Sequence, residues 1–159
     1  MTTRDRDDAG RARSARPRDA AGRPLPHGAD GVERVPEDLV LTADEAVTEA
    51  QRLLDAGLPF GAHEVLEGAW KAAAAPEREL WRGLAQVAVG LTHAQRGNAR
   101  GAVALLERGA DHVRRWVGDT PAGLDLPGLV AHADALAARI ADGAAPSETD
   151  LRPHLRPPT

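Results

Sequence analysis

The chain of 159 residues contains no cysteine, which excludes disulfides, thiolate metal sites and cysteine nucleophiles. Aromatic residues make up only 3% of the chain although 42% is hydrophobic, so a core must be built mostly from Ala, Leu and Val. Side chains this small favour helices that pack closely together. No apolar stretch is long enough to span a bilayer, and the polar N-terminus lacks the apolar region of a secretory signal. We expect a cytoplasmic protein with no membrane partner.

The charge balance also narrows the set of partners. The net charge is -4 and the isoelectric point is near 5.8, so nucleic acid is not an expected ligand of the domain as a whole. Arg is frequent whereas Lys71 is the only lysine, and Ala, Gly and Pro are abundant. This composition is typical of a GC-rich bacterial genome.

Composition divides the chain into three parts. Residues 1–37 are rich in Arg and Asp and have almost no large apolar side chain, so we expect a disordered arm that cannot offset its ordering entropy. We favour a solvated arm over one that binds acidic partners. Residues 38–143 carry the apolar pattern of a helical domain, and residues 144–159 form a short, proline-rich tail that we expect to be extended.

Apolar residues recur at helical spacing in five stretches, and no stretch alternates as a strand would. The spacing of a capping box at Thr42 and Glu45 starts the first stretch, Pro76 ends the second, and Asn98 is suited to cap the fourth. The expected helices are 42–57, 59–75, 77–96, 98–117 and 125–143. The short connections predict an all-α fold, a compact bundle of about five antiparallel helices.

The second stretch holds the only close group of reactive side chains. His63, Glu67 and Trp70 lie at i, i+4 and i+7 on one stripe of a helix, and Glu64 lies about 100° round from His63. This spacing fits a metal half-site, an acid/base pair or a structural hydrogen bond. The residues alone do not decide between the three.

The third stretch adds two polar residues seven positions apart, Gln86 and His93. If it forms an antiparallel hairpin with the second stretch, His93 should lie near His63 and Glu67, and Gln86 should lie nearer Trp70. The hairpin would then gather two imidazoles, carboxylates and an amide into one polar cluster.

Four further residues are assigned to packing. Trp70 and Trp81 should anchor the core or its rim, and Gly83 and Gly90 should let another helix approach the third one closely.

Three interpretations of the polar cluster compete. We favour a structural network of His63, Glu64, Glu67, Gln86 and His93 that fixes helix register or holds a small ligand. The second is a divalent-metal site, with a hydrolytic role, in which His63, Glu67 and His93 are ligands and Glu64 is a base. The third is metal-free acid/base chemistry by His63 and Glu67. No cofactor is firmly implied, and no catalysis can be assigned.

The other histidines are His27, His112, His132 and His154. None has an acidic partner at matching spacing on a shared apolar face, so we expect all four at the surface.

The runs Phe60–Trp70 (FGAHEVLEGAW), Trp81–Ala88 (WRGLAQVA) and Gly97–Ala102 (GNARGA), together with His93, resemble the bacterial and plastid family of domain of unknown function 309. The resemblance covers about residues 42–140 and implies a compact all-helical domain. It maps the family's polar pattern onto His63, Glu64, Glu67, Gln86 and His93, and it implies no established activity. Trp81 and Ala85 depart from the usual residues in ways that concern packing only.

A second class of function also fits the sequence. The third and fourth stretches, joined at Gly97 and Asn98, resemble a tetratricopeptide-like hairpin, which would make the chain a binding module for a peptide or a partner helix. No repeat of fixed period supports a full array. A homodimer is also compatible with an Ala-rich helical face.

Overall fold

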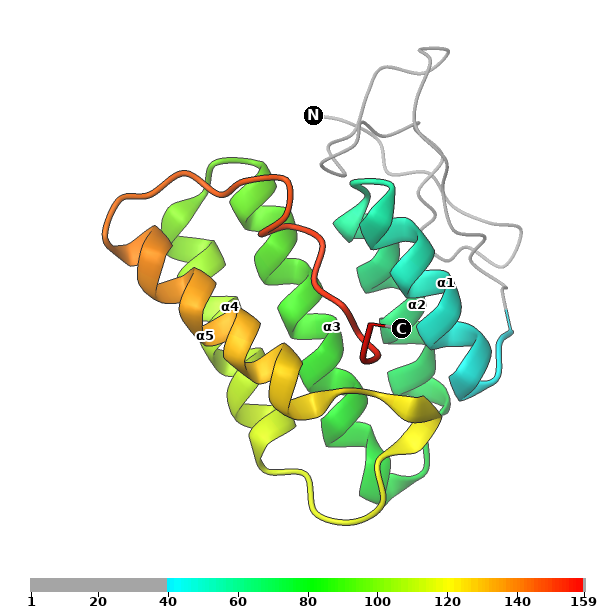
Figure 1. Cartoon of the computed structure of the whole chain (residues 1–159). Helices are drawn as coiled ribbons and strands as arrows, with labels where there is room; N and C mark the ends of the chain where they lie inside the picture. The colour runs from blue at the N-terminus through cyan, green and yellow to red at the C-terminus, as the bar shows by residue number, and fades with distance from the viewer. Residues whose placement is uncertain (1–39, 159) are drawn as a thin grey trace, which may run out of the picture.

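The computed structural model describes residues 40–158, which form an all-α bundle (Figure 1). The elements are α1 (Ala43–Asp55), α2 (Pro59–Ala72), α3 (Ala75–Gln95), α4 (Ala99–Arg114), the short 3-10 helix η1 (Pro121–Gly123) and α5 (Leu126–Ala141). The prediction of an all-α bundle of five helices is confirmed. The expected N-terminal arm of residues 1–37 lies outside the described residues. Within those residues, no helix has both the length and the apolar character needed to cross a lipid bilayer.

Local signals set most of the helix ends. Thr42 caps α1 through a reciprocal pair of hydrogen bonds, in which its Oγ1 accepts from the Glu45 amide at 3.1 Å and Glu45 Oε1 accepts from the Thr42 amide at 3.0 Å. Asn98 caps α4 by accepting from the Gly101 amide at 3.1 Å. Gly97 has a φ of 80°, which lets the chain leave α3 without steric cost.

Two helix boundaries differ from the prediction. Helix α2 ends at Ala72, and Pro76 lies in the first turn of α3, where its missing N–H costs no hydrogen bond. Helix α4 ends at Arg114, so Val117 is not on the buried face of a helix and is 87% exposed.

The helices pack chiefly against their neighbours in sequence, in the order α1, α2, α3, α4 and α5. Figure 1 shows α3 in the middle of this series, and α3 buries the most residues of any helix in the described chain, among them Leu80, Trp81, Leu84, Val87 and Leu91. A row of helices in sequence order leaves the first and the last helix apart. The segment after α5 fills part of the space between them.

Helices α3 and α4 meet along glycines. A Cβ atom on Gly83 would lie 2.7 Å from Cβ of His112, and one on Gly90 would lie 2.8 Å from Cγ of Leu106. A Cβ atom on Gly109 would lie 2.7 Å from the carbonyl oxygen of Gly83. These distances are shorter than non-bonded contacts allow, so the two helix backbones can approach this closely only with glycine at these positions.

Candidate functional site

The His63 motif forms a chain of polar contacts along α2. His63 Nε2 lies 2.8 Å from Glu67 Oε2, and Lys71 Nζ lies 2.8 Å from Glu67 Oε1. Burial raises the pKa of Glu67, but the hydrogen bond from Lys71 and the charge of His63 together outweigh it and leave this pKa below its usual range. The carboxylate therefore accepts from both neighbours on its own helix. Glu64 is half-buried beside this chain.

The second ring nitrogen of His63 has a different environment. Nδ1 is buried and has no hydrogen-bond partner, and the ring centroid lies 5.4 Å from that of Phe60. The ring therefore meets a carboxylate at Nε2 and the protein interior at Nδ1. One nitrogen of His63 is paired and the other is shielded from water.

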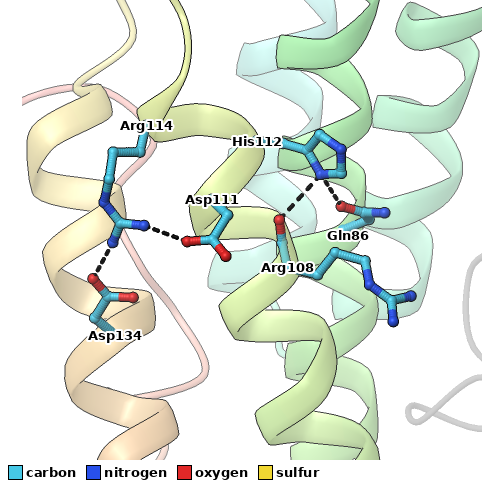
Figure 2. Close-up of polar contacts among 6 residues, drawn as sticks. All are labelled: Gln86, Arg108, Asp111, His112, Arg114 and Asp134. Carbon is cyan, nitrogen blue, oxygen red and sulfur yellow. Dashed lines mark hydrogen bonds and ion pairs between the residues drawn. The ribbon is translucent and has the colours of Figure 1, made fainter.

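Gln86 takes no part in the polar contacts along α2, so the expected cluster of Gln86 with His63 and Glu67 is wrong. Its Oε1 lies 2.7 Å from Nδ1 of His112, as Figure 2 shows, so Gln86 faces α4 rather than the motif on α2. The physical reason is the close approach of α4 at Gly83, which brings His112 within reach of α3.

His112 is also more deeply placed than expected, because its side chain is only 15% exposed. Its Nδ1 lies 3.1 Å from the Arg108 carbonyl as well as close to Gln86, and its Nε2 lies 3.2 Å from Glu79 Oε2. All three neighbours are oxygen acceptors, so both ring nitrogens of His112 lie beside an acceptor. The acidic partner comes from α3, and no helical spacing within α4 could have revealed it.

His93 belongs to a third, separate group at the junction of α3 and α4. Asn98 Nδ2 donates to His93 Nδ1 at 3.1 Å, while Asn98 Oδ1 caps α4. A Cβ atom on Gly101 would lie 3.0 Å from the His93 ring, so glycine makes room for that ring. His93 thus orients the cap of the next helix.

The expected cluster is therefore divided into three groups: His63 with Glu67, Gln86 with His112, and His93 with Asn98. Across residues 40–158, no three His, Asp or Glu side chains are placed so that they could hold a metal ion together.

The two tryptophans assigned to packing differ in depth. Trp81 is 1% exposed and its Nε1 donates to Glu77 Oε1 at 3.1 Å. Trp70 is half-buried, and the guanidinium of Arg82 lies 5.8 Å from its ring. On the other side of the bundle, Arg114 contacts Asp111 and Asp134 at 2.5 Å each and so joins α4 to α5 (Figure 2).

The most extensive long-range polar contacts involve the segment after α5, which the sequence analysis did not assign to a site. Figure 1 shows this segment running from the end of α5 back towards α1. Ser147 and Asp150 form a reciprocal turn, and the Asp150 carbonyl accepts from His132 Nε2 at 2.7 Å. From there the chain has no regular secondary structure and bends at Leu155 and Arg156, with Pro153 and Leu155 buried and the residue between them exposed.

Gln51 on α1 holds the main chain of this part of the tail. Its Nε2 donates to the Pro153 carbonyl at 3.0 Å and to Asp55 Oδ1 at 2.9 Å, and its Oε1 accepts from the Leu155 amide at 2.7 Å. The Leu155 carbonyl in turn accepts from the Asp125 amide at the start of α5, at 2.8 Å. Both main-chain groups of Leu155 are therefore paired with the helical domain.

Arg156 completes the attachment. Its guanidinium donates to the Ala122 carbonyl at 2.8 Å, to Thr48 Oγ1 at 2.8 Å and to Asp44 Oδ1 at 2.7 Å, with a longer contact of 3.1 Å to the Asp44 carbonyl. We call the surface that holds residues 153–156 the tail-binding face; it consists of Asp44, Thr48, Gln51, Ala122 and Asp125.

Residues 47–105 match the sequence model of the family described as "Domain of unknown function (DUF309)". The resemblance to this family that the sequence indicated is therefore confirmed over these residues. No curated protein and no solved structure matches the chain.

The DUF309 match runs from α1 into α4. The matched stretch contains His63, Glu67, Gln86, His93 and Asn98, but not His112 or Arg108. It also contains Gln51 of the tail-binding face. Helix α5 and the tail lie beyond it. The tail contacts therefore join residues beyond the matched stretch to a helix that begins the match.

Proposed function

We propose that this protein is a binding module whose tail-binding face holds a short polypeptide segment without regular secondary structure. The observation that carries the proposal is the double hydrogen bond of Gln51 with the main chain at Pro153 and Leu155. A side-chain amide offers a donor and an acceptor side by side, so it can pair with a carbonyl and a nearby amide of the same main chain.

The order of the helices supports the same proposal. Helices that pack chiefly on their neighbours in sequence are the arrangement of tetratricopeptide-like modules, which use one face of the row to hold extended segments. The polar motif residues make contacts within α2, between α3 and α4 and at the cap of α4. We assign them a structural role.

The test uses the full chain with its own tail weakened. In a tail-release variant, Leu155→Ser and Arg156→Ala remove the buried side chain and the guanidinium contacts. A fluorescent peptide of residues 147–159 should bind this variant, measured by anisotropy. It should bind the unaltered chain at least about tenfold more weakly, because the tethered tail competes at roughly millimolar effective concentration.

Two controls make the test decisive. Adding Gln51→Ala to the tail-release variant should abolish binding, whereas adding Glu49→Ala on the same helix should not, because Glu49 contacts Arg52 and not the tail. If the double substitution prevents folding, judged by circular dichroism, Arg156→Ala alone replaces it. A folded variant that binds no peptide would overturn the proposal.

Metal binding by His63, Glu67 and His93 stays a separate hypothesis. Elemental analysis of the purified chain beside a His63→Ala variant tests it. Near-stoichiometric metal that is lost in the variant would support the hypothesis, and metal-free protein in both samples would reject it.

A further inference from the structure

We infer that the tail-binding face selects an apolar residue followed by arginine, and that the tail is a built-in competitor of a partner protein's segment carrying that pair. This inference rests on the proposed function and names the chemistry of the partner. It follows from what surrounds the side chains of Leu155 and Arg156.

The arginine position is defined by acceptors from two elements. Asp44 and Thr48 come from α1, and the Ala122 carbonyl comes from η1. They surround the guanidinium with a carboxylate, a hydroxyl and a main-chain oxygen at distances of 2.7 to 2.8 Å. A planar fork of five N–H donors fits such a set, whereas the single ammonium group of lysine cannot reach all of them.

The ion pair alone would not give this selectivity. The Asp44 side chain is 78% exposed, and a single pair between exposed charges contributes little in water. Selection therefore depends on the directional bonds to the Ala122 carbonyl and Thr48, which orient the guanidinium. This argument predicts discrimination between arginine and lysine, which carry the same charge.

The positions before the arginine have unequal roles. Leu155 is 3% exposed and belongs to the hydrophobic core, and Pro153 is buried as well. His154 between them is exposed. The expected recognition pattern is thus a buried residue at the position of Pro153, any residue at that of His154, a buried apolar residue at that of Leu155, and then an arginine. Gln51 holds the main chain of such a segment by hydrogen bonds.

The tail can leave this face without undoing its attachment to α5. Asp150 is held separately, through His132 to its carbonyl and through Arg139 to its carboxylate at 2.6 Å. The contacts of residues 153–156 are with α1, η1 and the first residue before α5. A partner segment therefore has to replace one short stretch and not the whole tail.

The first experiment measures the side-chain preference with the tail-release variant. Peptides of residues 147–159 that carry Arg156→Lys or Leu155→Ala should bind about tenfold or more weakly than the native peptide. A peptide with His154→Ala should bind as well as the native one. In a protein that also carries Thr48→Ala and Asp44→Ala, the Arg156→Lys penalty should shrink, and in one that carries Glu49→Ala it should persist.

The outcomes separate this inference from the proposed function. If all peptides bind equally, the face holds a main chain without selecting side chains, and this inference fails while the proposed function survives. If no peptide binds the folded variant, both fail.

The second experiment tests displacement in the otherwise unaltered chain. Because the sequence has no cysteine, His154→Cys gives a single labelling site at an exposed tail position. Excess native peptide should lower the anisotropy of a fluorophore attached there as the tail is released, and the Arg156→Lys peptide should require about tenfold more. Unchanged anisotropy at saturating native peptide would overturn the competitor role of the tail.

Discussion

The side-chain oxygen of Gln86 lies 2.7 Å from Nδ1 of His112, and this hydrogen bond joins the middle of α3 to the end of α4. Both residues are half-buried, so the bond is partly shielded from competing water. Gln86 therefore pairs with α4, whereas a polar cluster with His63 between α2 and α3 was expected.

We expect Gln86→Ala to lower the free energy of unfolding by about 1 kcal/mol, because it removes one hydrogen bond and leaves His112 Nδ1 with only the Arg108 carbonyl. Gln86→Glu keeps an acceptor at this position and should retain most of the stability. Denaturant unfolding of the three proteins at neutral pH provides the measurement. Equal losses in the two variants would contradict a role for the acceptor.

The glycine contact between α3 and α4 gives a prediction with a matched control. Gly83→Ala should destabilise the fold by about 1–3 kcal/mol, because the new Cβ would lie 2.7 Å from Cβ of His112 and 3.0 Å from the Gly109 carbonyl. Gly68→Ala on α2 meets no atom within 4 Å and should stabilise the protein by up to about 1 kcal/mol. Thermal unfolding distinguishes the two. A stabilising Gly83→Ala would mean that α4 does not approach α3 so closely.

The cap of α4 predicts coupling between two residues. Asn98→Ala should cost about 1 kcal/mol of stability, because the Gly101 amide loses its acceptor. His93→Ala should cost less, and the two losses should not add, since His93 acts on the cap through Asn98. A double-mutant cycle measures this coupling. Strict additivity would show that His93 contributes only by packing.

The turn that anchors the tail should depend on pH. The Ser147 amide lowers the pKa of Asp150 most, burial opposes it, and the Ser147 hydroxyl and Arg139 lower it further, so this pKa lies below its usual range. A pKa that is lower in the folded state adds stability above the usual carboxyl pKa of about 4, and that stability is lost as pH falls through the lower folded value.

The stability difference between the unaltered chain and an Asp150→Asn variant should therefore be full at neutral pH and shrink below about pH 4. Urea unfolding across this range supplies the comparison. A difference that stays constant down to pH 2 would show that the Asp150 charge does not stabilise the turn.

The sequence by itself determined the helices and the contacts within them. The capping pair of Thr42 and Glu45 and the pair of His63 and Glu67 were readable because their partners lie three or four residues apart. Contacts at this separation form within one helical turn, whatever the rest of the chain does. The match to DUF309 over residues 47–105 confirms the family resemblance for part of the predicted stretch of about residues 42–140.

Only the tertiary structure decided which helices share their polar residues. Gln86 could have faced α2 or α4, and the choice was made by the glycines that let α4 approach. The position of the tail is even harder to predict from the sequence, because Gln51 and Leu155, which share a hydrogen bond, are 104 residues apart. Its proline content favoured an extended chain, but its position depends on α1, η1 and α5 together. Such contacts carry no local periodicity, because their geometry exists only after the helices have packed.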